Sequence, residues 1–221
     1  MDASAVPADT LLGRFTPEGA LKLDELHIPE AELRLIDKII IVACGSAYYA
    51  GLVAKYAIEH WTRVACEVEI ASEFRYRDPI ITGSTLVVTI SQSGETADTL
   101  MAIRHARAQR AKVIAICNTN GATIPRESDA VIYTHAGPEI GVASTKGFLT
   151  QLVACYLLAL YMTVRRARAR GIDGDRVLDQ ALHRRDAQVA GGEHQRPRAV
   201  GEVRDRGAPP AIRLEIPDAR L

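Results

Sequence analysis

The chain has 221 residues, 48% of them hydrophobic, and its 27 Lys and Arg residues balance its 27 Asp and Glu residues. A balanced charge excludes the strong basic field that draws a protein to nucleic acid or to an anionic membrane. Only 5% of the residues are aromatic, which argues against a base-stacking surface. We therefore expect a protein with an apolar core and with neither nucleic acid nor a membrane as partner.

The cysteines and the apolar runs indicate the compartment. Cys44, Cys66, Cys117 and Cys155 each stand in an apolar run, and no two of them have CxxC spacing. We predict buried free thiols rather than disulfides or zinc ligands, and hence a cytoplasmic location. No signal peptide is visible at the N-terminus. The longest apolar stretch, residues 148–164, contains polar residues and is short for a membrane span, so it predicts a buried helix.

The first elements of the chain alternate between strand and helix. Residues 1–37 form a mixed lead-in with a short helix that opens at Pro29. An apolar run at 38–44 predicts a buried strand, and the turn at 45–47 leads into a helix over 48–61. The apolar face that we predict for this helix consists of Leu52, Val53, Tyr56, Ala57 and Trp61. Residues 65–70 alternate apolar and acidic side chains, as a half-exposed edge strand does.

The central stretch, residues 85–99, organises the second half of the domain. Its apolar, β-branched run at 86–90 predicts a buried strand, and a helix follows from 97 to about 109. Further strands are predicted at 112–117 and 130–134, and a last helix reaches about residue 166. This alternation predicts an α/β fold in which helices cover both faces of a mostly parallel sheet.

The segment between the central strand and its helix has the composition of an anion site. Ser91, Ser93 and Thr96 supply three hydroxyls within six residues, and Gly94 allows a close backbone approach. The free N–H groups and positive dipole end of the helix favour a phosphate. The alternative is that Ser93 or Thr96 merely caps the helix. We favour the phosphate, because capping needs only one such residue.

Two other strand ends carry residues of the same kind. Ser46 and Asn118 follow the strands that end near 44 and 117. Ligands of open parallel sheets bind beyond the carboxyl ends of the strands, so these residues and Ser91 are expected in one shared pocket. Glu95 is placed in the first turn of the helix, where an anion suits the dipole, and its charge makes it a poor phosphate ligand.

Motifs for other chemistries are missing. The turn after residue 44 lacks the further glycines of GxGxxG, and the sequence contains no GxxxxGK[ST], so we predict no cofactor. No metal site or catalytic residue is predicted. Cys44 fits a core thiol better than a nucleophile. Glu139 could act as a general base or hold its loop through hydrogen bonds, and we favour the second.

A set of motifs resembles one known family. They are CGS at 44–46, ASEFRY at 71–76, SQSGETADT at 91–99, CN at 117–118 and AGPEIGVASTK at 136–146. In this order they resemble the first sugar isomerase (SIS) domain of the glucosamine-6-phosphate synthase family, the isomerizing glutamine–fructose-6-phosphate aminotransferases. The resemblance extends from about residue 9 to about residue 162.

The resemblance implies a fold and a ligand. The fold is a five-stranded parallel sheet in a doubly wound, flavodoxin-like sandwich. The ligand is fructose 6-phosphate or glucosamine 6-phosphate. Its phosphate would be held by Ser91, Gln92, Ser93 and Thr96, and its sugar would be contacted by Ser46, Val142 and Ser144. A homodimer formed through the SIS domain is also implied.

The chain departs from that family at both ends. The family has a glutaminase domain and a second SIS domain, which the residues before 9 and after 166 do not resemble. We divide the chain into a lead-in at 1–37, an SIS domain at 38–166, and a poorly ordered or shifted-frame tail at 167–221, in which 177–189 could form a short helix. The expectation is a truncated phosphosugar-binding domain of amino-sugar biosynthesis with little or no turnover. The alternatives are a phosphosugar-sensing module and a stand-alone isomerase that uses Glu139 and His135.

Overall fold

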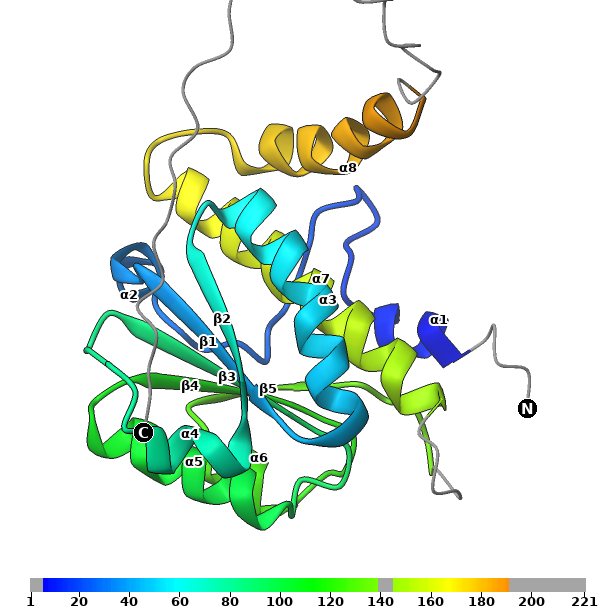
Figure 1. Cartoon of the computed structure of the whole chain (residues 1–221). Helices are drawn as coiled ribbons and strands as arrows, with labels where there is room; N and C mark the ends of the chain where they lie inside the picture. The colour runs from blue at the N-terminus through cyan, green and yellow to red at the C-terminus, as the bar shows by residue number, and fades with distance from the viewer. Residues whose placement is uncertain (1–5, 139–144, 191–221) are drawn as a thin grey trace, which may run out of the picture. The chain divides into compact units, whose positions relative to one another are not determined.

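The computed structural model describes residues 6–138 and 145–190. The chain divides into two compact units, residues 1–184 and 185–221, and the described part of the second is only the end of the last helix. In chain order the elements are α1 (Val6–Leu11), α2 (Glu30–Leu35), β1 (Lys38–Ala43), α3 (Gly45–Thr62), β2 (Ala65–Ile70), α4 (Ala71–Arg77), β3 (Thr85–Ser91), α5 (Ala97–Ala108), β4 (Lys112–Cys117), α6 (Thr123–Glu127), β5 (Ala130–Tyr133), α7 (Thr145–Arg168) and α8 (Gly174–Ala190) (Figure 1).

The five strands form one parallel sheet in the order β2-β1-β3-β4-β5. This is the flavodoxin-like order of a doubly wound sheet. All seven residues of β3 are buried, as expected of a central parallel strand covered on both faces. β2 pairs with β1 and lies at the edge, which explains its acidic residues. The predicted α/β fold with a doubly wound parallel sheet is confirmed.

Two apolar layers cover the two faces of the sheet, because successive side chains of a strand point to opposite sides. Ile39 and Ile41 of β1 pack in the layer formed by α3 and α7. Ile40 and Val42 pack in the layer formed by α4, α5 and α6. Figure 1 shows α3 and α7 on one face and α4, α5 and α6 on the other.

The helix predicted from the longest apolar stretch is α7. It is the one helix in the described part of the chain that is long and apolar enough to cross a membrane, but 72% of its most apolar window is buried inside the structure. Its buried side chains, including Leu157 and Leu158, belong to the core that α3 and the sheet share. The prediction of a buried helix is confirmed.

The apolar face predicted for α3 is wrong at two of its five positions, Val53 and Tyr56. Tyr56 is 75% exposed and Val53 is 42% exposed. The side of α3 that is buried carries mostly small residues, namely Ala47, Ala50, Gly51, Ala54, Ala57, Ile58 and Thr62. A Cβ at Gly51 would lie 2.9 Å from Ile41 Cγ2. At Gly51 the helix therefore lies too close to the sheet for a side chain.

Helical structure continues beyond residue 166, where the predicted SIS domain ends. α7 extends to Arg168, and α8 lies within the first half of the segment for which a tail is predicted. Leu178 and Ala181 of α8 are buried against Leu160 and Val164 of α7, which gives this segment a small core of its own. Residues 191–221 lie outside the described part, and the three-part division stays a prediction. The short helices α1 and α4 were not predicted.

Candidate functional site

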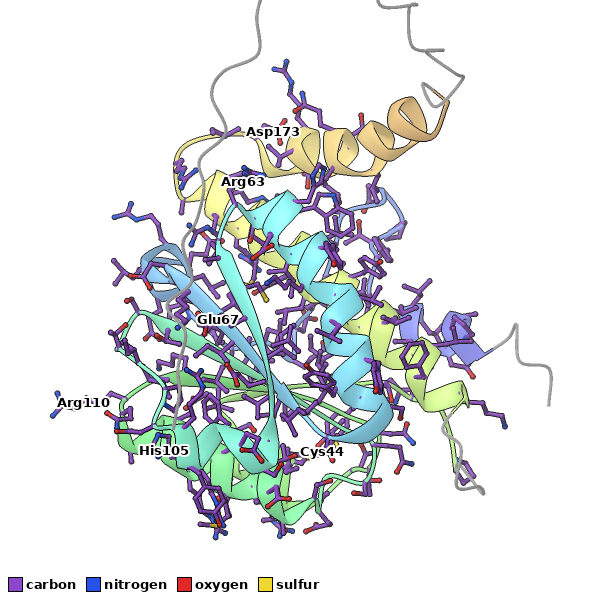
Figure 2. All side chains as sticks on the ribbon, in the orientation of Figure 1. Cys44, Arg63, Glu67, His105, Arg110 and Asp173 are labelled. Atoms are coloured by element: carbon purple, nitrogen blue, oxygen red, sulfur yellow. The ribbon has the colours of Figure 1, made fainter. Side chains whose placement is uncertain are left out.

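The site predicted from the sequence lies where the connections of the sheet change direction. β1 and β3 are neighbours, and Ala43 pairs with Ile90 near their carboxyl ends. The chain leaves β1 through α3 toward β2, and it leaves β3 through α5 toward β4 on the other side. Because α3 and α5 cover opposite faces, both helices start beside the crevice between these two strand ends. Figure 2 labels Cys44, which joins β1 to α3 at this edge.

The loop that joins β3 to α5, which we call the 91–96 loop, is held by its own hydroxyls. Ser91 is 4% exposed, and its Oγ accepts a hydrogen bond from the Gly94 N–H at 3.1 Å. The same oxygen lies 3.2 Å from Thr96 Oγ1. The Oγ of Ser93 accepts from the Glu95 N–H at 3.3 Å. These bonds curl the loop so that its hydroxyls gather at the start of α5.

Thr96 occupies the N-cap position of α5 but does not cap it with its side chain. Its hydroxyl pairs with Ser91 instead. The first backbone N–H groups of a helix have no partner within the helix, and together they carry a partial positive charge. The N-cap residue of α3, Cys44, also forms no side-chain cap. Two helix N-termini with available N–H donors therefore flank the crevice, an arrangement that suits an anion.

Gly94 is required by both conformation and space. Its φ of +69° is in the left-handed region that favours glycine. A Cβ at this position would lie 2.6 Å from the Cβ of Ala122 and 2.8 Å from the Sγ of Cys117. Burial raises the pKa of the Cys117 thiol, so the group beneath the loop stays neutral at pH 7.

The segment after β4, including the start of α6, holds the backbone of the 91–96 loop through hydrogen bonds. The Gln92 carbonyl accepts from the Asn118 N–H and from Thr119 Oγ1, each at 3.3 Å. The Gly94 carbonyl accepts from the Ile124 N–H of α6 at 2.9 Å. The loop backbone is thus fixed before any ligand arrives, which lowers the entropy cost of binding.

Asn118 does not present its amide as a free ligand of the predicted pocket. Its Oδ1 accepts from Thr134 Oγ1 at 2.9 Å and from the Ala136 N–H at 2.8 Å, while its Nδ2 donates to the Gly137 carbonyl at 2.8 Å. The side chain therefore clasps the chain that follows β5. Sequence reasoning placed Asn118 at the right strand end but missed this role.

Glu95 is not in the first turn of α5 as predicted, because that helix starts at Ala97. Its carboxylate Oε1 accepts from the Thr123 N–H at the start of α6, at 2.7 Å. Hydrogen bonding by the side chain and the backbone of Thr123 lowers the pKa of the Glu95 carboxyl below its usual value of 4.5. The residue is therefore a carboxylate at neutral pH.

The structure brings together five of the seven predicted ligand residues. Ser46 is exposed on the first turn of α3, and Ser91, Gln92, Ser93 and Thr96 form the neighbouring loop. Val142, Ser144 and Glu139 lie outside the described residues. His135 is exposed after β5, with its ring 6.2 Å from that of Tyr133. The assignment of ligand contacts to these residues remains a prediction.

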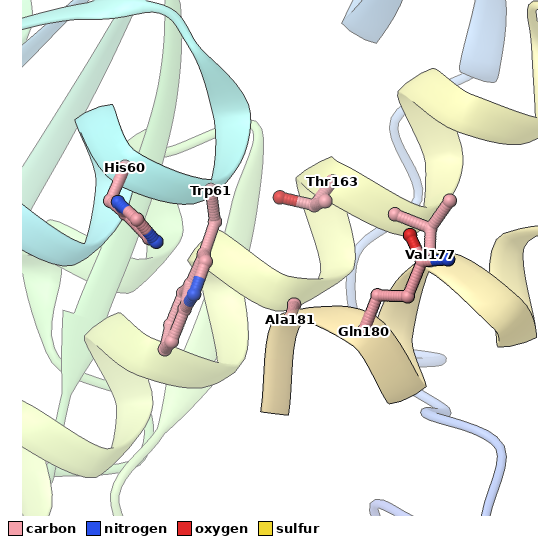
Figure 3. A pocket seen from close by; sticks show the side chains of 6 residues that line it. All are labelled: His60, Trp61, Thr163, Val177, Gln180 and Ala181. Atoms are coloured by element: carbon pink, nitrogen blue, oxygen red, sulfur yellow. The ribbon is translucent and has the colours of Figure 1, made fainter. Parts of the chain in front are cut away.

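Other sites are less suited to chemistry. The four cysteines are free, and burial raises the pKa of Cys66 and Cys155 to about 12, which makes these thiols unreactive. Across residues 6–138 and 145–190, no group of three His, Cys, Asp or Glu side chains could hold a metal ion. One small pocket is lined by His60, Trp61, Thr163, Val177, Gln180 and Ala181 (Figure 3). It lies at the far end of α3, about 20 Å from Ser46 by helix rise.

Comparisons with known proteins agree with this architecture. The profile of the family described as "SIS domain" matches residues 32–161. Glutamine–fructose-6-phosphate aminotransferase [isomerizing] of Streptomyces coelicolor is 69% identical over 173 residues, which are 78% of this chain and 28% of that protein. The enzyme of the same name from Mycobacterium tuberculosis is 62% identical over 83% of this chain and 28% of its own length.

A solved structure shows the same fold at moderate identity. The C-terminal domain of glucosamine-fructose-6-phosphate aminotransferase from Francisella tularensis superposes with a TM-score of 0.71 and 39% identity, over 85% of this chain and 51% of that one. The chain thus spans about half of this solved domain. It spans 28% of the length of the two curated relatives named above.

Proposed function

This chain belongs to the SIS domain family, and from that premise we propose that it binds a phosphosugar at the crevice between β1 and β3. The ligand is fructose 6-phosphate or glucosamine 6-phosphate. The observation that carries the proposal is the 91–96 loop, in which preorganised hydroxyls gather at an N-terminus that no side chain caps. Neutral donors and a helix dipole are the usual means of binding a phosphate without a fixed cation.

We propose the following roles for the individual residues. Ser91, Gln92, Ser93 and Thr96 hold the phosphate. Ser46, on the helix that starts across the crevice, contacts the sugar together with Val142 and Ser144. The identity to the curated relatives supports the assignment of this domain to a glutamine–fructose-6-phosphate aminotransferase of amino-sugar biosynthesis. The free thiols support a reducing location, which we propose to be the cytoplasm.

A calorimetric titration tests the ligand. The purified chain is titrated with fructose 6-phosphate, with inorganic phosphate and with unphosphorylated fructose. Saturable binding of the phosphosugar, with weaker binding of phosphate and none of fructose, supports the proposal. Failure of a folded chain to bind either phosphorylated compound refutes it.

A matched pair of variants tests the loop. Ser93→Ala removes an exposed hydroxyl from the loop, and we expect about tenfold weaker binding, since a hydrogen bond to a charged group is lost. Ser84→Ala removes a hydroxyl near the opposite end of the same strand, where it bonds to Asp37 at 2.9 Å. Binding by Ser84→Ala should equal that of the unchanged chain. Equal losses in both variants would argue against a phosphate in this loop.

We further propose that the chain forms a homodimer through this domain. One face of α3 carries three large exposed side chains at neighbouring positions of the helix. They are Tyr49, Val53 and Tyr56, which are 62%, 42% and 75% exposed. Large apolar side chains grouped on an exposed helix face support self-association. Light scattering should report a dimer for the unchanged chain and a monomer for Tyr56→Lys. A monomer at every concentration would refute this part of the proposal.

A further inference from the structure

A carboxylate lies within the loop that we propose for the phosphate. Glu95 is exposed and stands between Gly94 and Thr96, two residues that build the loop. A negative charge beside a phosphate weakens binding by like-charge repulsion. The presence of Glu95 at this position therefore calls for a compensating role.

The structure shows where this carboxylate is engaged. Its Oε1 accepts from the Thr123 N–H at 2.7 Å, and the next N–H, that of Ile124, donates to the Gly94 carbonyl at 2.9 Å. Two consecutive N–H groups of α6 therefore hold two consecutive residues of the loop. The guanidinium of Arg126, which donates to Thr123 Oγ1 at 3.0 Å, adds positive charge near the carboxylate.

The close packing of Gly94 makes this attachment consequential. The α-carbon of Gly94 is seated so closely on Ala122 and Cys117 that a Cβ would overlap both. With the loop seated in this way, the Gly94 N–H donates to Ser91 Oγ at 3.1 Å. A contact that keeps Gly94 against α6 therefore also keeps the Ser91 hydroxyl in place.

We infer that Glu95 is a positioning residue, which anchors the 91–96 loop to α6 through its hydrogen bond to Thr123 and so holds the loop donors toward the phosphate. This inference rests on the proposed function. An anchoring role and a purely electrostatic role of Glu95 predict opposite changes in phosphate affinity when the side chain is removed. If Glu95 only repels the ligand, its removal strengthens phosphate binding, whereas the loss of an anchor weakens it.

Two substitutions separate the hydrogen bond from the charge. Glu95→Gln keeps an acceptor oxygen for the Thr123 N–H and removes the charge. Glu95→Ala removes both. We expect Glu95→Gln to bind fructose 6-phosphate as tightly as the unchanged chain or more tightly, and Glu95→Ala to bind about tenfold more weakly. Glu18→Ala is the control for net charge, because Glu18 is exposed and lies in the lead-in.

Hydrogen exchange provides a readout without ligand. The Thr123 amide should be protected in the unchanged chain and in Glu95→Gln, and should exchange faster in Glu95→Ala. Circular dichroism of each variant verifies the fold.

The outcomes separate this inference from the proposed function. If the unchanged chain binds and Glu95→Ala binds equally or more tightly, the inference is overturned while the proposed function stands. Equal weakening by Glu95→Gln and Glu95→Ala also overturns it, since the acceptor would then not matter. If the unchanged chain binds neither phosphosugar nor phosphate, the proposed function fails and the inference with it.

Discussion

Gly94→Ala should destabilise the protein more than the same substitution at a glycine whose surroundings leave room for a Cβ. The new Cβ would lie 2.6 Å from the Ala122 Cβ and 2.8 Å from the Cys117 Sγ. Holding an L-residue at φ +69° costs about 1–2 kcal/mol. Overpacking a filled site adds about 1–3 kcal/mol. The free energy of unfolding should fall by about 2–5 kcal/mol, a large part of the roughly 5–15 kcal/mol of a typical domain.

Gly121→Ala isolates the steric part of this loss. Gly121 has nearly the same φ, +72°, but a Cβ there would meet no atom within 4 Å. Its substitution should cost only the conformational term of about 1–2 kcal/mol. Urea denaturation of both variants, followed by circular dichroism, gives the difference directly. Fructose 6-phosphate binding should weaken in Gly94→Ala and not in Gly121→Ala. Equal destabilisation of the two variants would refute the packing argument.

Three further predictions concern the surroundings of the loop. Asn118→Ala removes three side-chain hydrogen bonds and should lower the free energy of unfolding by about 2–4 kcal/mol in urea denaturation. Hydrogen bonding by Thr123 lowers the pKa of the Glu95 carboxyl in the folded state. The stability that the charged carboxylate adds is therefore present above pH 4.5 and is lost as the pH falls through the lowered folded-state pKa. The difference in the free energy of unfolding between the unchanged chain and Glu95→Gln should accordingly shrink below pH 4.5. Cys66 and Cys155, with pKa values near 12, should resist iodoacetamide at pH 8 until denaturant is added, as mass spectrometry can show.

Each of these predictions has a contrary result. Asn120 is an exposed neighbour of Asn118 in the same turn, so Asn120→Ala should leave the free energy of unfolding unchanged. A loss of stability equal to that of Asn118→Ala would contradict the role of the Asn118 hydrogen bonds. A stability gap for Glu95→Gln that stays constant from pH 7 to pH 3 would contradict the shifted carboxyl. Cys155 is only 1% exposed, so its rapid alkylation in the native chain would contradict its burial.

The strands were predictable because their signal is local. Residues 86–90 and 112–117 are mostly apolar, and the structure places β3 and β4 there within one residue. The 91–96 loop was also recognisable, because its hydroxyls and glycine stand side by side in the sequence. The short helices α1 and α4 were missed, since six or seven residues show too little periodicity to identify a helix.

The buried face of α3 could not be read from hydrophobicity. The prediction placed the large side chains of Val53 and Tyr56 on the buried face, yet the alanine side packs on the sheet. What decides is the distance between the helix and the sheet, which is short at Gly51 because Ile41 lies directly beneath it. Such a distance depends on the sheet that is formed, and the local pattern does not contain it.

The sequence by itself determined the class of fold, the succession of its five strands, the loop that has the composition of an anion site, and the family. The tertiary structure alone decided that the carboxylate of Glu95 is held by α6 and that the amide of Asn118 clasps the chain after β5. The physical reason is separation along the chain. Thr123 lies 28 residues from Glu95, and Gly137 lies 19 residues from Asn118. These two hydrogen bonds form because the parallel strands bring their carboxyl ends to one edge of the sheet.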